Sequence, residues 1–471
     1  MLDVGQIERK TQDRIVKLFI EKLDYTYLGN WEDRIGNSNI EEELLVKFLK
    51  KQKYSDILIK KALYELNKTA SPQNKSLYDI NKEVYSLLRY GAQVKEEVGE
   101  NKQTVFFIDW KNPKKNDFYI AEEVTVQGQN SKRPDIVLYI NGIAIAILEL
   151  KRSVISVSEG IRQNLDNQKE MFIRQFFATI QLVMAGNDTE GLRYAIIETP
   201  EKYYLTWKED CAIKNKLDKH LFCMCNKERI IELMHDFIVF DMGIKKICRH
   251  NQFFGVKASQ KHIMKREGGI IWHTQGSGKS LIMIWLAKWI RENITDSRVL
   301  IITDREELDG QIEKFFTGVN EDIYRTKSGK DLINKLNSPL PWLMCSLVHK
   351  FKNNAEEDYE KYLEEIKINL PSNFKPKGDL YVFVDECHRT QSGKLHNAMK
   401  EILPDSIFIG FTGTPLLKKD KKKSIEIFGR YIHTYKYDEA VDDNVVLDLQ
   451  YEAREVEQKI KRMESNEIIL L

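Results

Sequence analysis

A glycine-rich loop with a single lysine is the most chemically specific feature of this sequence. The loop reads TQGSGKS, and its candidate nucleotide-binding residues are Thr274, Gly276, Ser277, Gly278, Lys279 and Ser280. It lies between the apolar segment GIIW and an apolar helical segment, so its backbone N–H groups and the positive helix end can approach phosphate oxygens. We expect Lys279 to contact the β and γ phosphates and the Ser280 hydroxyl to bind Mg2+. His273 stands where the full consensus has glycine, and a glycine turn with a solvated lysine is the structural alternative.

Two adjacent carboxylates follow the apolar segment LYVFV further along the chain. A nucleoside triphosphatase needs one carboxylate at a strand end to hold the metal and a second to polarise the attacking water. We assign Asp385 to the metal and Glu386 to the water. By itself such a pair is usually a solvated turn, but together with the phosphate loop it indicates nucleotide hydrolysis.

A second group of charged residues lies in the first half of the chain. Asp135 follows Arg133 and Pro134, a turn signal comes at Asn141 and Gly142, and the apolar segment GIAIAILELK ends with Glu149 and Lys151. If these segments form a hairpin, the two carboxylates meet at one end, and Glu149 and Lys151 share a strand face. Two carboxylates can bind Mg2+, and the lysine can orient or deprotonate the attacking water. The pattern predicts phosphodiester hydrolysis, and the alternative is an ordinary edge strand.

The elements around this second group predict a compact α/β unit over residues 1–205. Its first hundred residues have apolar positions at helical spacing, as in RIVKLFIEKL and EEELLVKFLKK. Strand candidates follow in TVFFID, FYIAEEVTV, DIVLYI, GIAIAILEL, RYAIIET and KYYLTW. A charged segment over 206–245 is interpreted as a helical connector.

Residues 246–445 alternate apolar strand, loop and helix, as in GGIIWHTQGSGKSLIMIWL, VLIITD, WLMCSLV, LYVFVDE and IFIGFTG. This order is typical of a parallel, doubly wound sheet. We therefore predict the α/β class, with a nuclease-like unit first and a phosphate-loop unit second. A charged tail occupies 446–471.

The composition narrows the class of protein without revealing a partner. Charged residues make up 31% of the chain and the net charge is +2, so the totals do not indicate a nucleic-acid binder. There is no long apolar run and the N-terminus is polar, so we expect a cytoplasmic protein. Six cysteines are expected to be reduced. Cys211, His220, Cys223 and Cys225 are zinc-binding types, but they lack paired structural spacing.

Several motifs resemble those of superfamily 2 helicases. DECH at 385–388 resembles their DExH box, and TGTP at 412–415 resembles the motif that couples nucleotide state to DNA. Arg249 and Gln252 resemble the adenine-reading segment of these motors, and the stretch from Thr303 to Gln311 resembles the segment that touches the DNA backbone. The resemblance implies ATP and Mg2+ as cofactors and a RecA-like fold.

The first unit is similar to the PD-(D/E)xK nucleases, with PD at 134–135 and ExK at 149–151. Relatives of this nuclease often carry a Q-x-x-x-Y motif in the following helix. Here Gln168 is followed by Phe172 in place of tyrosine, so the phenolic hydroxyl is missing.

A nuclease of this type followed by such a motor resembles the R (restriction and translocation) subunit of type I restriction enzymes. Further segments of likeness are ERKTQDRIVKLF, NDTEGLRYAIIETPEKYYLTWKED and FGRYIHTYKYDEAVDD. The resemblance implies ATP-dependent DNA translocation and double-strand DNA cleavage. It also implies two kinds of protein partner, a specificity subunit and methyltransferase subunits.

Members of that family continue into a second RecA-like domain, so we expect this chain by itself to bind ATP weakly and not to translocate. One alternative is a stand-alone helicase-nuclease of DNA repair or processing, which would need no methyltransferase partner. Another is a non-catalytic DNA-binding scaffold. The basic run KKDKKK at 418–423 is expected either to touch DNA phosphates or to be a solvated loop.

Overall fold

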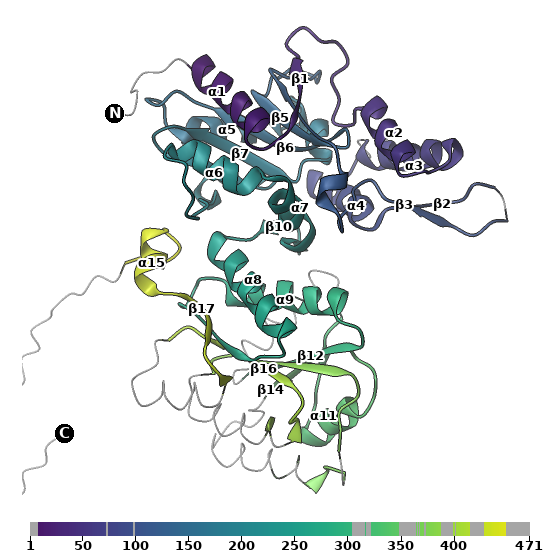
Figure 1. Ribbon diagram of the computed structural model, residues 1–471, viewed down its shortest axis with the longest axis vertical. Coiled ribbons are helices and arrows are strands. Elements are labelled where there is room, and N and C mark those ends of the chain that lie inside the picture. Colours follow the sequence, from purple (N-terminus) through teal and green to yellow (C-terminus); the bar gives the residue numbers. More distant parts are fainter. Residues whose placement is uncertain are drawn as a thin grey trace, which may run out of the picture.

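Two large β-sheets, one in each half of the chain, organise the computed structural model (Figure 1). The N-terminal sheet lies at the top of the view and the C-terminal sheet at the bottom. The structure describes residues 8–71, 74–97, 99–303, 316, 322–347, 364, 366, 368–371, 374–387, 399–400, 402–414 and 428–448. Within these residues no helix is long and apolar enough to cross a membrane.

Helices dominate the beginning of the chain, as the sequence predicts. They are α1 (Glu8–Glu21), α2 (Glu42–Lys51), α3 (Asp56–Ala70) and α4 (Leu77–Tyr90). Ser55 and Ser76 cap α3 and α4 by accepting backbone N–H groups of the first turn, which satisfies donors that a helix start leaves unpaired. We call α2, α3 and α4 the helical arm. A small hairpin of β2 (Ala92–Val94) and β3 (Gln103–Val105) extends from it.

The N-terminal sheet is mixed and has six strands in the order β1-β4-β5-β6-β7-β8. The strands are β1 (Thr26–Asn30), β4 (Phe118–Glu122), β5 (Ile136–Ile140), β6 (Ile143–Leu150), β7 (Leu182–Asn187) and β8 (Gly191–Ala195). Two pairs, β1 with β4 and β6 with β7, are parallel, and the others are antiparallel. Every residue of β5, β6 and β7 is buried, so this hairpin and its neighbour form the centre of the sheet.

Helix α5 (Val157–Asn167) covers one face of this sheet, because Val157 and Ile161 pack with Ile147 and Val183 in one apolar cluster. The segment KYYLTW is not a full strand, contrary to expectation. It begins with a short 3-10 turn at Glu201–Tyr203 and then makes an isolated bridge between Leu205 and Tyr194.

The connector contains a β-hairpin as well as helices. Helices α6 (Lys216–Cys225) and α7 (Lys227–Asp236) are followed by β9 (Ile238–Asp241) and β10 (Ile244–Ile247). The prediction of an all-helical connector is therefore wrong for its end. Met242 and Gly243 both have positive φ, the geometry of a tight two-residue hairpin turn, and methionine in the first position hid this turn from sequence rules.

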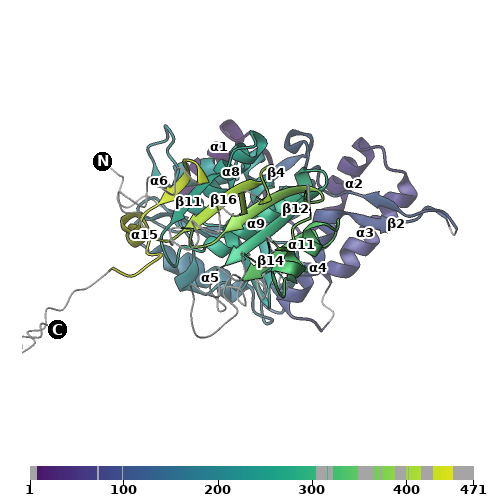
Figure 2. The ribbon, with the colours of Figure 1, turned by 90° about the horizontal axis from the view of Figure 1, so that it is seen from below.

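The C-terminal sheet has seven strands, all parallel, in the order β13-β14-β12-β15-β16-β11-β17. They are β11 (Gly269–His273), β12 (Ser297–Thr303), β13 (Tyr324–Arg325), β14 (Leu343–Leu347), β15 (Asp379–Val384), β16 (Ile407–Thr412) and β17 (Tyr431–Tyr435). In Figure 2, β14, β12, β16 and β11 are seen side by side. The predicted α/β class, with a parallel sheet in the second half, is confirmed.

Four described helices belong to this half: α8 (His250–Met264), α9 (Lys279–Asn293), α11 (Gly329–Leu336) and α15 (Tyr437–Asp442). Strands β15, β16 and β11 are neighbours and run in the same direction. Their carboxyl ends therefore meet at one edge, where ligands bind in open parallel sheets. The phosphate loop, the carboxylate pair and the Thr412–Thr414 segment all follow these three strands.

Candidate functional site

The hairpin of β5 and β6 brings Asp135 beside Glu149. Asn141 and Gly142 both have positive φ and form the tight turn, and Ile136 pairs with Leu148. At the open end of the hairpin the Leu150 N–H donates to Asp135 Oδ2 over 2.6 Å. A carboxylate that ends one strand is thus fixed against the end of the other strand, as the hairpin hypothesis requires.

Glu149 and Lys151 lie on one face of β6, below α5. A Cβ atom built on Gly160 of α5 would lie 3.5 Å from Glu149 Cβ and 3.5 Å from Lys151 Cγ. The Cβ of Ala185 would be closer still, at 3.1 Å, so glycine at position 160 favours this close approach of the helix to the sheet. The predicted sharing of a strand face is confirmed, since both side chains border the same helix residue.

The Glu149 side chain is fully buried. Its Oε1 accepts a hydrogen bond from Asn167 Nδ2 over 3.3 Å, and Lys151 Nζ donates to the Leu150 carbonyl oxygen over 2.9 Å. Burying a carboxylate costs free energy unless donors or a cation compensate it. Asp135 and Glu149 offer oxygen ligands, which Mg2+ prefers, so the residues present fit a magnesium ion.

The helix residues singled out by the sequence have other contacts. Gln168 Nε2 donates to the Asn164 carbonyl oxygen, and its Oε1 accepts from the Glu198 N–H, so this side chain holds the end of α5 to a neighbouring turn. Lys132 Nζ lies 4.0 Å from the centre of the Phe172 ring. Both side chains are therefore held by residues other than Glu149. Sequence reasoning missed Asn167, which does contact it, because asparagine in a helix carries no motif.

The phosphate loop connects β11 to α9. Gly276 and Gly278 have φ of 81° and 86°, a region that disfavours side chains, and Gly278 is the N-terminal cap residue of α9. Ser277 is fully buried and its hydroxyl donates to the Thr274 carbonyl oxygen over 2.6 Å. The loop is closed on itself, with the positive end of α9 directed at the space that phosphates would occupy.

Gln252 and Arg249 lie against this loop. Gln252 Nε2 donates to the carbonyl oxygens of Ser277 and Gly278 over 3.3 and 3.2 Å, and its Oε1 accepts from the Arg249 N–H over 2.8 Å. Gln252 is buried, and Arg249 caps the start of α8. The two residues therefore join α8 to the phosphate loop, and the adenine contact suggested by the resemblance stays a prediction.

Lys279, Asp385 and Glu386 lie at the same sheet edge. Lys279 Nζ donates to the His273 carbonyl oxygen over 3.3 Å, and a Cβ on Gly413 would lie 2.9 Å from that nitrogen. Asp385 is buried and its N–H donates to the Ile302 carbonyl oxygen over 3.0 Å. Glu386 follows with φ of 48°. Three motifs distant in sequence thus converge, and Ser280 follows Lys279 in the first turn of α9.

Cys387 lies close enough to Lys279, Asp385 and Glu386 to interact with their charges. Burial raises the pKa of its thiol, the charges of Asp385 and Glu386 raise it further, and the charge of Lys279 acts in the opposite direction. The lysine and the two carboxylates therefore act electrostatically on a single side chain.

His273 explains why the loop departs from the consensus. Its side chain is fully buried, with Nε2 at 2.8 Å from His433 Nδ1 and Nδ1 at 3.4 Å from Asn251 Nδ2. Burial lowers its pKa well below the ordinary value, and the His433 and Lys279 environment lowers it further. The imidazole packs between α8 and β17, so this position serves the core.

Some predicted residues lie outside the described part of the chain. They are 304–311 of the predicted DNA-contacting segment, His388, Pro415 and the basic run 418–423. Of the cysteines considered for zinc, Cys223 and Cys225 are buried, and His220 Nδ1 accepts from the Leu192 N–H over 3.1 Å. Among described residues, the one group of three side chains with metal-binding geometry is His235, Asp236 and Glu292.

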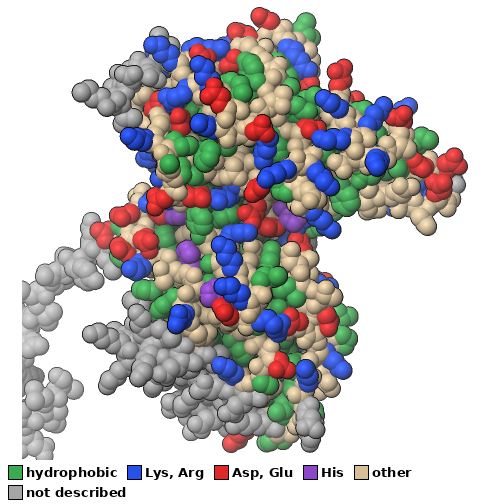
Figure 3. Space-filling view, in the orientation of Figure 1, with side chains coloured by type: hydrophobic (Ala, Val, Ile, Leu, Met, Phe, Trp, Pro, Cys, Tyr) green, Lys and Arg blue, Asp and Glu red, His purple; other side chains and the backbone are tan. Residues whose placement is uncertain are grey.

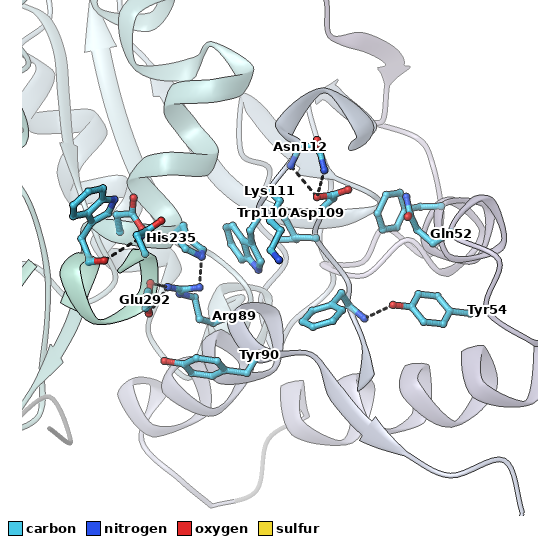
Figure 4. Close-up of a pocket in the computed structure, with 16 residues that line it drawn as sticks. Gln52, Tyr54, Arg89, Tyr90, Asp109, Trp110, Lys111, Asn112, His235 and Glu292 are labelled. Carbon is cyan, nitrogen blue, oxygen red and sulfur yellow. Dashed lines mark hydrogen bonds and ion pairs between the residues drawn. The ribbon is translucent and has the colours of Figure 1, made fainter. Parts of the chain in front are cut away.

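That group lies beside a cavity of about 960 Å3 between the helical arm and the second half of the chain (Figure 4). Arg89 of α4 reaches into the group, where it donates to Glu292 of α9 over 2.6 and 2.7 Å and contacts the ring of His235. A guanidinium in this position already neutralises the carboxylate, so the arrangement is an ionic link between the halves. Glu292 lies at the C-terminal end of α9, the opposite end of this helix from Lys279 and the phosphate loop.

Figure 3 shows a mixed distribution of surface charge on one face of the molecule. On the face shown in Figure 3, lysine and arginine side chains are interspersed with aspartate and glutamate, in keeping with the net charge of +2.

Two family models match different parts of this chain. Residues 6–202 match the family model for the type I restriction enzyme R protein N terminus, and residues 251–469 match the SWI2/SNF2 ATPase model. The HindI type I restriction enzyme endonuclease subunit of Haemophilus influenzae is 25% identical over 97% of this chain and 46% of its own length. The SsaAORF53P type I restriction enzyme endonuclease subunit of Staphylococcus saprophyticus is 26% identical over 74% of this chain and 37% of its own length.

This chain therefore spans less than half the length of these curated relatives. Among solved structures, the UvsW helicase from Bacteriophage T4 has 19% identity and a TM-score of 0.31, and the match covers 44% of this chain and 66% of that one.

Proposed function

Because this chain belongs to the R-subunit family of type I restriction enzymes, we propose that it cleaves DNA with Mg2+ at Asp135, Glu149 and Lys151 and binds ATP at the loop around Lys279. The observation that carries the nuclease assignment is the hydrogen bond from the Leu150 N–H to Asp135, which joins the two carboxylate positions. The proposed nuclease unit is 1–205, the connector 206–245, the motor unit 246–445 and the following link 446–471.

In the nuclease unit, Asp135 and Glu149 would hold the metal through their oxygens. The bound ion supplies a Lewis acid for the phosphate and lowers the pKa of water. Lys151, on the same strand face as Glu149, would turn its ammonium donors from the Leu150 carbonyl oxygen to the attacking water or the phosphate oxygens. The burial of Glu149 excludes bulk water from its carboxylate, which strengthens the electrostatic contacts made there.

In the motor unit, the backbone of Thr274, Gly276, Ser277 and Gly278 would hold the phosphates, with Lys279 on the β and γ phosphates. Ser280 and Asp385 would hold Mg2+, and Glu386 would polarise the attacking water. Arg249 and Gln252 are proposed to recognise adenine. Gln252 already contacts the loop through Ser277 and Gly278, so it would link the bound base to the loop that holds the phosphates.

The partners follow from the family and are proposals for this chain. They are double-stranded DNA, a specificity subunit and methyltransferase subunits. Co-purification with tagged methyltransferase and specificity subunits tests this, since a stand-alone DNA-processing enzyme would be recovered without them.

The test of the nuclease is Mg2+-dependent cleavage of plasmid DNA, with and without ATP. Glu149→Ala and Lys151→Ala should each abolish cleavage. Their matched controls are Glu170→Ala and Lys169→Ala. These variants remove the same types of charge from exposed positions just after α5. If wild type is inactive by itself, the assay is repeated with the partner subunits added. Equal cleavage by wild type and Glu149→Ala would show that the site is wrongly assigned.

A further inference from the structure

A cluster of buried polar side chains lies between α5 and the sheet, around Glu149. Asn164 and Asn167 are both fully buried and lie one turn apart on α5. Asn164 Nδ2 donates to the Met184 carbonyl oxygen over 2.9 Å, and Asn167 Nδ2 donates to Glu149 Oε1. Tyr204 belongs to the same apolar cluster as Ile161 and Ala185, so its ring packs on the face of the sheet that carries Glu149.

The fold delivers Tyr204 to this place through the segment that follows β8. Leu205 exchanges two backbone hydrogen bonds with Tyr194, of 2.8 and 2.9 Å, which fixes the chain beside the strand. Because neighbouring extended residues point to opposite sides, Leu205 packs against the larger core while Tyr204 faces α5. Burial raises the pKa of the Tyr204 hydroxyl, and the charge of the nearby Glu149 raises it further.

Three atoms of this cluster lack a hydrogen-bond partner within the part of the chain that the structure describes. They are the Tyr204 hydroxyl, Asn164 Oδ1 and Asn167 Oδ1. Buried polar groups in proteins are nearly always satisfied, and a phenylalanine at 204 would fill the same space without this cost. Unused donors and acceptors beside one buried carboxylate are therefore typical of a site completed by a bound species.

We propose that Asn167 and Tyr204 are positioning residues of the nuclease site. The Asn167 N–H holds the Glu149 carboxylate, and the Tyr204 O–H, which has no partner among the described residues, donates to that carboxylate when it binds a metal. The inference rests on the proposed nuclease function. The two residues act through Glu149 and do not themselves contact DNA. The partners that orient metal ligands commonly change metal affinity by about 10–100-fold when they are removed.

The experiment measures Mn2+ binding to the full chain by titration calorimetry without nucleotide, together with thermal unfolding. Tyr204→Phe should weaken Mn2+ binding about tenfold while leaving the unfolding temperature unchanged or higher, because it removes only an unsatisfied buried hydroxyl. Asn167→Ala should weaken binding by a similar factor. Tyr203→Phe is the matched control, since the neighbouring Tyr203 is 57% exposed, and it should bind Mn2+ as wild type does.

Glu149→Gln separates this inference from the function on which it rests. If Glu149→Gln abolishes Mn2+ binding while Tyr204→Phe and Asn167→Ala bind as tightly as wild type, the positioning role is refuted and the metal site stands. If Glu149→Gln binds Mn2+ as tightly as wild type, the proposed nuclease site itself is wrong. Weaker Mn2+ binding by Tyr204→Phe with unchanged thermal stability supports the inference, because a purely structural role would not produce it.

Discussion

The buried histidine His220 makes the stability of the N-terminal unit depend on pH in a calculable way. It lies in α6, is buried against β8, and accepts a hydrogen bond from the Leu192 N–H through Nδ1. Burial lowers the pKa of this imidazole from 6.5 to about 4, and the positive charges of Lys216 and Lys219 act in the same direction. The neutral ring is therefore the form that the folded protein holds.

Between pH 6.5 and about 4 the unfolded chain binds a proton at this histidine and the folded chain does not. Unfolding then takes up a proton, so the free energy of unfolding falls as pH falls through this window. At 1.36 kcal/mol per pKa unit, the difference amounts to about 3 kcal/mol. His220→Asn keeps an acceptor for the Leu192 N–H and removes the titrating group. Over the same pH window, the free energy of unfolding of the variant should therefore fall by about 3 kcal/mol less than that of wild type.

The assay is urea unfolding of wild type and His220→Asn at a series of pH values from about 7.5 to about 4. Part of the pH dependence should remain in the variant, because burial also lowers the pKa values of His273 and His433. Equal losses of unfolding free energy in the two proteins between pH 6.5 and 4 would refute the reasoning, since His220 would then be protonated without penalty.

Three further predictions concern the motor unit and its link to the first half. Lys279→Ala should reduce ATP affinity by about tenfold or more, the loss of one charged hydrogen bond, and leave Mn2+ binding at the nuclease unchanged; calorimetry with each ligand checks both. Gly278→Ala should weaken ATP binding, because Gly278 has φ of 86° and the new Cβ would lie 2.3 Å from a glutamine side chain. Gly243→Ala is the control: it has the same backbone strain in an open turn and should not change ATP binding. Arg89→Ala should lower the free energy of unfolding, measured in urea, by about 1–3 kcal/mol. Lys75→Ala breaks an exposed ion pair and should lower it by less than about 1 kcal/mol. Similar losses in the two variants would contradict the interdomain link.

Local sequence rules were sufficient to predict those side chains whose positions are set by a single strand, turn or helix start. The alternation of side chains along a strand placed Glu149 and Lys151 on one face, and the turn at Asn141 and Gly142 brought Asp135 back to them. The phosphate loop needs only an apolar strand, glycines at positive φ and a following helix. These features depend on residues close together in the chain, so they can be predicted from it.

Contacts between distant segments were decided by the tertiary structure. Asn167 contacts Glu149, and Tyr204 packs on the same sheet face, because a helix and a bridging segment cover that face. The residue types alone do not indicate this. His273 looked like a defect in the loop, yet its ring pairs with His433 from a strand far along the chain. Arg89 likewise reaches Glu292 across the two halves.

The sequence by itself thus determined the chemistry available at each site, because motifs specify residue types at fixed local spacing. Only the packing of sheets and helices decided which further side chains surround those residues, since burial and hydrogen-bond partners are properties of the folded chain.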